Sequence, residues 1–168
     1  MRRSIFLFCA AALVLAPPLF SQAPLVPGNP DTAARYQAIH AGSSGDTVTI
    51  QQPASPSLVV QFELAYISCT ATGTVTLSQN GTAATSTTLA TKALNRSPSP
   101  SQAKAWSASN VSGGTTLNVY TVPAGAPGLT LDLSKFYLDI NSGTAANLTL
   151  TVSSGCTPSQ VMIQWTEH

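Results

Sequence analysis

Two histidines and six acidic residues are the side chains from which a hydrolytic site in this 168-residue chain would have to be built. Nucleophilic hydrolysis needs a base beside a hydroxyl, and the histidines are His40 and His168. Glycoside hydrolysis needs two carboxylates facing one cleft, and Asp132 and Asp139 fit best because we expect both on outward faces of adjacent strands. The simpler interpretation is that His40 ends a strand or helix and that the aspartates keep their strands soluble. We therefore expect a protein that is not an enzyme, with a hydrolase as the last alternative.

The sequence contains few residues that could bind a metal or a cofactor. The same two aspartates could hold Ca²⁺ together with backbone carbonyls, but no run of acidic residues has the spacing of known calcium loops. Two scattered histidines and one cysteine pair beyond the N-terminal segment are too few for a zinc or copper site. We expect neither a metal nor a cofactor.

Three aromatic residues, Trp106, Tyr120 and Tyr137, are candidate ligand-binding residues. Saccharide-binding modules stack exposed aromatic rings on the apolar faces of sugars, and alternation places Tyr120 and Tyr137 on the outward faces of their strands. Trp165 falls on an inward face by the same rule. The competing interpretation is that a loop or a second layer covers these rings and that they serve packing alone.

The N-terminal 23 residues have the pattern of a secretory signal peptide. Arg2 and Arg3 precede an apolar run from Ile5 to Ala16, and small residues follow at Ser21 and Ala23. The run is shorter than the roughly 20 residues that cross a bilayer, so we expect no membrane span. The mature chain is expected to be secreted, periplasmic or extracellular.

Cysteine usage agrees with export. Cys9 lies in the signal, which leaves Cys69 and Cys156 for a single disulfide in an oxidising compartment. The bond would close a loop of about 86 residues, for which the chain-entropy model gives about 4 to 5 kcal/mol. It would also tie the two halves of the chain together, so we interpret the Ser/Pro-rich residues 97–101 as a surface loop; two free buried thiols are the alternative.

Low charge excludes some partners. Loss of Arg2 and Arg3 with the signal leaves five basic and six acidic side chains, and only 8% of the whole chain is charged, against about 25% in an average domain. We therefore expect no basic patch of the kind that binds nucleic acid or an anionic membrane. The 145 residues left after the signal match the usual size of one domain.

Alternation of apolar residues with a period of two dominates from Thr47 onward and predicts strands. In the clearest strand, Leu58 to Ser68, it places Val60, Phe62, Leu64 and Tyr66 on one inward face. The same alternation recurs in residues 117–119, 129–133, 136–140, 148–152 and 161–165. About nine strands separated by turn residues predict an all-β fold, an antiparallel β-sandwich or jelly roll.

The boundaries follow from these patterns. We assign residues 1–23 to the signal peptide, 24–46 to a lead-in segment and 47–168 to the sandwich domain. In the lead-in, Asn29-Pro30-Asp31 could cap a short helix to about Ile39, and a strand from Tyr36 to His40 is equally compatible with the sequence.

One hairpin is predicted residue by residue. Asn80-Gly81 is the preferred pair for a type I′ two-residue turn. Its register would place Thr76 opposite Thr85 and Thr74 opposite Thr87, which makes a threonine-rich face.

No motif ties the chain to a known family, and the functional hypothesis therefore rests on export, low charge and threonine-rich strands. We expect a secreted or envelope-associated, non-catalytic β-sandwich acting as a structural or adhesive module. Its partners would be further copies of itself, paired through edge strands, or a polysaccharide or other extracellular surface. A carbohydrate-binding module is the second hypothesis and a hydrolase the third.

Overall fold

The computed structural model describes residues 33–42, 46–53, 58–95, 99–125, 127–139, 146–153, 155–156 and 158–168. The expected signal peptide and most of the lead-in lie outside the described residues. In the described residues the fold is all-β: there are fourteen strands, nine of them with four or more residues, and no helix. The prediction of an antiparallel sandwich is confirmed.

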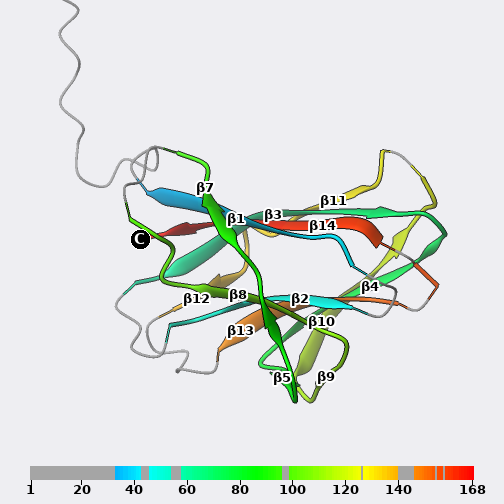
Figure 1. Cartoon of the computed structure of the whole chain (residues 1–168), viewed down its shortest axis with the longest axis horizontal. Coiled ribbons are helices and arrows are strands. Elements are labelled where there is room, and N and C mark those ends of the chain that lie inside the picture. The colour runs from blue at the N-terminus through cyan, green and yellow to red at the C-terminus, as the bar shows by residue number, and fades with distance from the viewer. Residues whose placement is uncertain are drawn as a thin grey trace, which may run out of the picture.

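Two antiparallel sheets form two layers (Figure 1). Sheet A has the order β11-β3-β14-β1-β7, with β12 also paired to β3. Its strands are β11 (Leu129–Asp132), β3 (Val60–Cys69), β14 (Pro158–Glu167), β1 (Ala34–His40), β7 (Thr91–Ala93) and β12 (Tyr137–Leu138).

Sheet B has the order β10-β4-β13-β2-β8-β6. Its strands are β10 (Thr115–Val122), β4 (Gly73–Gln79), β13 (Asn147–Val152), β2 (Thr47–Gln51), β8 (Lys104–Ala108) and β6 (Thr87–Thr88). A separate two-stranded ribbon, β5 (Thr82–Ala83) with β9 (Val111–Ser112), lies beyond the sheet B layer.

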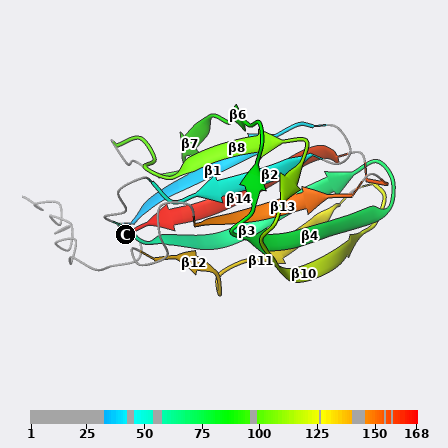
Figure 2. The same cartoon turned by 90° about the horizontal axis from the view of Figure 1, so that it is seen from below.

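The chain changes sheets between β6 and β7. β6 pairs with β8 in sheet B, and three residues later β7 pairs with β1 in sheet A. Residues 84–91, which we call the crossing segment, therefore run along one side of the sandwich, as the view from below shows (Figure 2). This passage joins the two layers along the edge where β8 and β1 lie.

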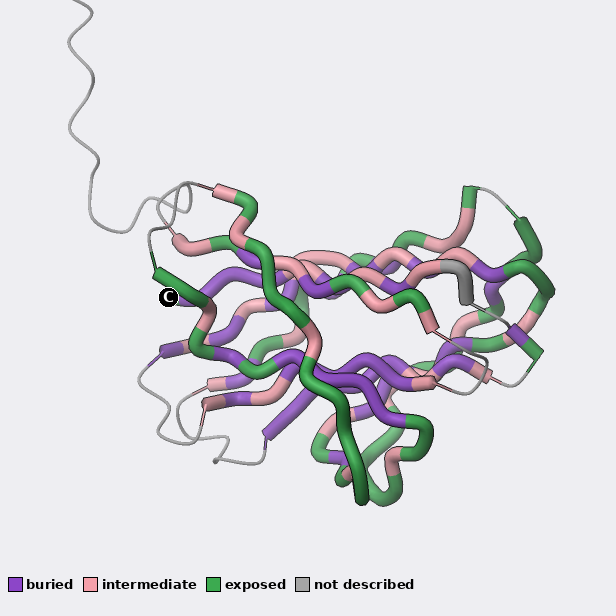
Figure 3. Tube along the Cα trace, in the orientation of Figure 1, coloured by how far each residue is buried: buried purple, intermediate pink, exposed green. Residues whose placement is uncertain are grey.

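The core lies between the sheets, where the inward residues of both layers are buried (Figure 3). Trp165, Phe62 and Ile50 are fully buried. Tyr36 packs against Trp165 with ring centroids 6.0 Å apart, and its hydroxyl donates to the Ser99 carbonyl at 2.8 Å. The inward side predicted for Trp165 is correct.

The sandwich begins at Ala34, ahead of the expected start at Thr47. Of the two alternatives for the lead-in, residues 34–40 adopt the strand: β1 pairs with β14 over seven residues. Alternation decides this, because Tyr36 and Ala38 are buried while Arg35 and Ile39 are exposed. A helix would not have placed both buried side chains on one sheet face.

The face predicted for β3 is wrong beyond Phe62. Phe62 lies opposite Trp165 while Leu64 lies opposite Gln164, so Glu63 is an extra residue in the ladder. Such a bulge reverses the side to which later residues point. Ala65 and Ile67 are consequently buried, and Leu64 and Tyr66 lie on the outer face.

The predicted hairpin at Asn80-Gly81 does not form. Asn80 has the positive φ of a tight turn, 60°, but Gly81 is not among the residues with positive φ, which a type I′ turn requires at both positions. β4 pairs instead with β10 and β13, and β5 pairs with β9. Thr76 therefore faces Val119 and Thr151 rather than Thr85.

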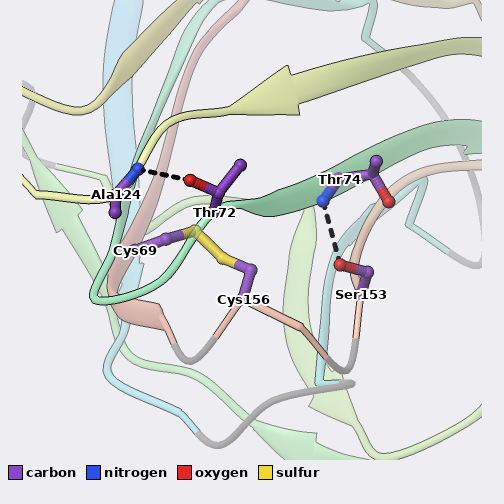
Figure 4. The surroundings of a disulfide bond; sticks show 6 residues. All are labelled: Cys69, Thr72, Thr74, Ala124, Ser153 and Cys156. Atoms are coloured by element: carbon purple, nitrogen blue, oxygen red, sulfur yellow. Dashed lines mark hydrogen bonds between the residues drawn. A yellow bond between two sulfur atoms is a disulfide. The ribbon is translucent and has the colours of Figure 1, made fainter.

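The disulfide between Cys69 and Cys156 is present, as predicted (Figure 4). It connects the end of β3 to the connection between β13 and β14, and both cysteines are buried. The Ser153 hydroxyl accepts a hydrogen bond from the Thr74 backbone at 2.9 Å beside it. A Cβ on Gly73 would lie 2.5 Å from Cys156 Cβ, so glycine is required here for close approach.

A buried carboxylate holds the residues that lead into β8. Glu167 accepts hydrogen bonds from the Ser101 hydroxyl at 2.6 Å and from the Gln102 and Ala103 backbone N–H groups at 3.0 and 3.1 Å. The Trp165 indole N–H also donates to it, at 3.1 Å. β8 is thereby fastened at its start to the last strand of sheet A.

No helix in the described residues is long and apolar enough to cross a membrane.

Candidate binding groove beside Trp106

The structure does not bring the three predicted aromatic residues together. Trp106 lies on β8 and Tyr120 on β10, four strand positions apart in sheet B, which corresponds to roughly 19 Å. Tyr137 lies on β12 in the other sheet and is 59% exposed. A shared aromatic platform made of these three residues is therefore not formed.

The outward face predicted for Tyr120 is wrong. The register of β10 against β4 shifts between Thr116 and Asn118, so Leu117 is an extra residue. Beyond it the faces exchange: Tyr120 lies opposite the buried Val75 and packs against the core, while Val119 is 54% exposed.

The two aspartates considered for glycoside hydrolysis are not opposed across a cleft. Asp132 pairs with Leu64, whereas Leu138, which precedes Asp139, pairs with Val60. Four residues along β3 correspond to roughly 13 Å, beyond the spacing of about 5 to 9.5 Å in catalytic carboxylate pairs.

His40 has a carboxylate partner. Its Nε2 lies 3.1 Å from Asp46 Oδ2, and the pair lines a hollow of about 390 Å³ together with Ser86, Ser107 and Ser109. Nucleophilic sites use a histidine that a carboxylate orients, but among the described residues Asp46 alone hydrogen-bonds to the His40 ring, and no hydroxyl does. The described residues also contain no group of three histidine, cysteine, aspartate or glutamate side chains that could hold a metal.

A larger groove, with a volume of about 630 Å³, lies on the outer face of sheet B beside Trp106. Residues paired across antiparallel strands point to the same face. The pairs Thr49 with Trp106 and Gln51 with Lys104 therefore line up on this face, and Thr88 and Asn147 extend these two rows. Gln51, Lys104 and Trp106 make the floor of the groove, whereas Thr49 is fully buried beside them.

The indole of Trp106 is fixed in the floor. Its N–H donates to Gln51 Oε1 at 3.0 Å, and only 8% of the residue is exposed. Thr49 and Thr149 beside it are fully buried, and their hydroxyls lie 2.8 Å apart in a hydrogen bond. Trp106 is thus a partly covered groove residue rather than the open stacking ring that the aromatic hypothesis expected.

One wall is held by a side-chain amide. Asn147 is 3% exposed, and it accepts from the Gly81 N–H at 3.2 Å and donates to the Gly81 carbonyl at 2.9 Å. A Cβ on Gly81 would lie 2.5 Å from a Val111 side-chain carbon, so any larger residue here would displace Val111 of β9. Thr82 and Ala83 follow directly and line the groove.

The crossing segment makes the opposite wall. Ser86, Thr88, Leu89 and Thr91 line the groove, and the Leu89 N–H donates to the Ala105 carbonyl at 2.9 Å. This segment is rich in exposed hydroxyls. Lys104 is the one charged residue among the described residues that line the groove.

Sequence reasoning found Trp106 but missed Gln51, Lys104 and Asn147. The sequence gives only a weak indication that Gln51 and Lys104 belong to a site. Gln51 is a polar residue at the end of the short strand β2, and Lys104 is one at the start of β8. The sequence gives none for Asn147, since its role depends on Gly81, which is 66 residues away.

Comparison with known proteins gives no match to this chain among family models, curated proteins or solved structures. The arrangement of the groove residues is therefore the evidence for its function.

Proposed function

We propose that this protein is an exported, non-catalytic β-sandwich that acts as an adhesive interaction module and binds a saccharide in the groove beside Trp106. The observation that carries the proposal is the groove itself, which gathers an indole, two amides and several hydroxyls around one hollow of about 630 Å³. Ligand sites commonly measure about 300 to 1,000 Å³.

The chemistry of the lining favours a saccharide. A sugar presents hydroxyls that both donate and accept hydrogen bonds, next to apolar C–H faces. Gln51 supplies an amide, Thr82 and Thr88 supply hydroxyls, and Trp106 and Leu89 supply apolar surface. Asn147 holds one wall and Glu167 holds the residues that lead into β8, and this rigidity lowers the entropy lost when a ligand binds.

Export is supported by the N-terminal pattern and by the disulfide, which persists in oxidising compartments. A chain with 8% charged residues suits a partner that is recognised mainly through its hydroxyl groups. Both features support a role at an extracellular surface.

Trp106→Leu should abolish saccharide binding by the full chain, because it removes the floor of the groove. A glycan array followed by calorimetry on the strongest hit measures this. Tyr137→Leu is the matched control, since Tyr137 is exposed on the other sheet, and it should leave the affinity unchanged. Thr88→Ala, at an exposed groove residue, should weaken binding several-fold without loss of folding.

The proposal fails if no saccharide binds, or if the Tyr137 variant loses binding while folded Trp106 and Thr88 variants keep it. Fluorescence separates these outcomes from unfolding, because Trp165 is fully buried and reports on the core.

A second candidate function is self-assembly by strand addition at β10. This strand is the edge of sheet B, has eight residues and carries no charged side chain. The other edges are short, and β7 and β11 carry Lys92 and Asp132. Part of β10 is blocked: the bulge interrupts it, and the Val119 N–H donates to the Asn118 side-chain oxygen at 2.8 Å.

Asn118→Val should strengthen self-association, because it frees the Val119 N–H for a second strand and adds a residue that favours strands. Sedimentation equilibrium of the full chain at millimolar concentration measures the dimer fraction. Asn110→Val, at an exposed asparagine outside β10, is the control and should change nothing. Thr121→Lys should remove the dimer; a monomeric Asn118 variant, or an unaffected Thr121 variant, would refute the candidate.

A further inference from the structure

The groove carries one charge that nothing neutralises. Lys104 is exposed, and no described residue forms a hydrogen bond or an ion pair with its ammonium group. No acidic residue is among the described residues that line the groove. Among the other described cations, Arg35 Nε lies 3.2 Å from Glu63 Oε2 and Lys135 interacts with Asp132, whereas Lys92, outside the groove, is exposed and unpaired as well.

We propose that the groove selects an acidic saccharide, such as a uronic acid unit, whose carboxylate binds Lys104. This inference rests on the proposed function and narrows its ligand. In a chain with so few charges, an unpaired ammonium group beside hydroxyl and amide donors attracts a carboxylate, and such a charge-assisted hydrogen bond is stronger than a neutral one.

The spacing of the floor fits one sugar ring. Lys104 and Trp106 are two residues apart on β8 and point to the same face, which places their Cα atoms roughly 7 Å apart. Gln51 lies directly opposite Lys104, and its side chain is fixed by the Trp106 indole. A ring against the indole therefore has its substituents within reach of both the amide and the ammonium.

Matched pairs of trisaccharides test the inference on the full chain. Galacturonate, glucuronate and mannuronate trimers are titrated against galactose, glucose and mannose trimers, at low and at high salt. The best acidic trimer should bind about fivefold more tightly than its neutral counterpart at low salt. The preference should vanish in about 0.5 M salt, where exposed charges are screened.

Lys104→Met should remove the preference, so that the ratio of the affinities for the acidic and the neutral trimer falls from about five to about one. Lys92→Met is the matched control: Lys92 is exposed on β7, lies outside the groove lining and should not affect the preference.

Equal affinities within every pair, or a preference that survives in the Lys104 variant, would overturn the acidic selectivity and leave saccharide binding standing. Failure of every trimer and of the wider glycan array would overturn the proposed function, and the selectivity with it.

Discussion

At the scale of single residues, the polar side chains of this protein mostly serve the backbone. Asn147 holds Gly81, Glu167 holds residues 101–103, and Asn118 binds the N–H of the residue that follows it. Because only 8% of residues are charged, side-chain amides and one buried carboxylate form the stabilising contacts that ion pairs form in more highly charged proteins. Buried donors and acceptors without such partners would destabilise the fold.

Asp132 gives a pH prediction at this scale. Hydrogen bonds from the Ser134 side chain and from the Ser134 N–H, the latter at 2.9 Å, lower the pKa of its carboxyl below the ordinary value, while desolvation opposes this shift and Lys135 favours it. A group whose pKa is lowered in the folded state stabilises the fold above its unfolded pKa, and this contribution is lost as the pH falls through the folded pKa.

Ser134→Ala should therefore raise the pKa of Asp132 toward its ordinary value, without restoring it fully because the backbone donor remains. Carbon-detected NMR titration of the carboxyl between pH 2 and 6, a range roughly centred on the ordinary aspartate pKa, measures the midpoint. Thr130→Ala, on the same face of β11, is the control. An unchanged midpoint in the Ser134 variant would contradict the assignment.

At the scale of elements, two bulges decide which faces the strands present. Glu63 in β3 and Leu117 in β10 are extra residues, and beyond each of them the inward and outward sides exchange. The sequence shows unbroken alternation through both points, because a bulge is defined by the partner strand and not by the residue itself. Both errors of face assignment have this single cause.

The disulfide is the covalent link between elements, and it spans 87 positions in the sequence. Cys69→Ala/Cys156→Ala should lower the free energy of unfolding by up to about 4 to 5 kcal/mol, because the unfolded chain regains its loop entropy. Denaturant unfolding of oxidised wild type and the double variant gives the difference. Reduced wild type should lose the same amount, and a loss below about 1 kcal/mol would show that the unfolded chain gains little freedom.

At the scale of the whole molecule, the candidate site exists because the β5–β9 ribbon and the crossing segment border the outer face of sheet B. Thr82 and Ala83 of the β5–β9 ribbon line the groove from one side, and Ser86, Leu89 and Thr91 of the crossing segment line it from another. Sequence reasoning treated that face as a solvated hairpin surface. The local turn signal was right at Asn80, but the strand that follows pairs with β9, a choice set by contacts more than 20 residues away.

The sequence by itself determined the all-β class, the pairing of Cys69 with Cys156 and most of the core, because alternation and cysteine number are local properties that survive any strand order. Only the tertiary structure decided which side Tyr120 faces, that Asp132 and Asp139 stay apart, and that Trp106 lines a groove with Gln51 and Lys104. These outcomes depend on strand register and on which distant segments pack against each sheet. Both arise when strands far apart in sequence pair, and no single segment encodes them.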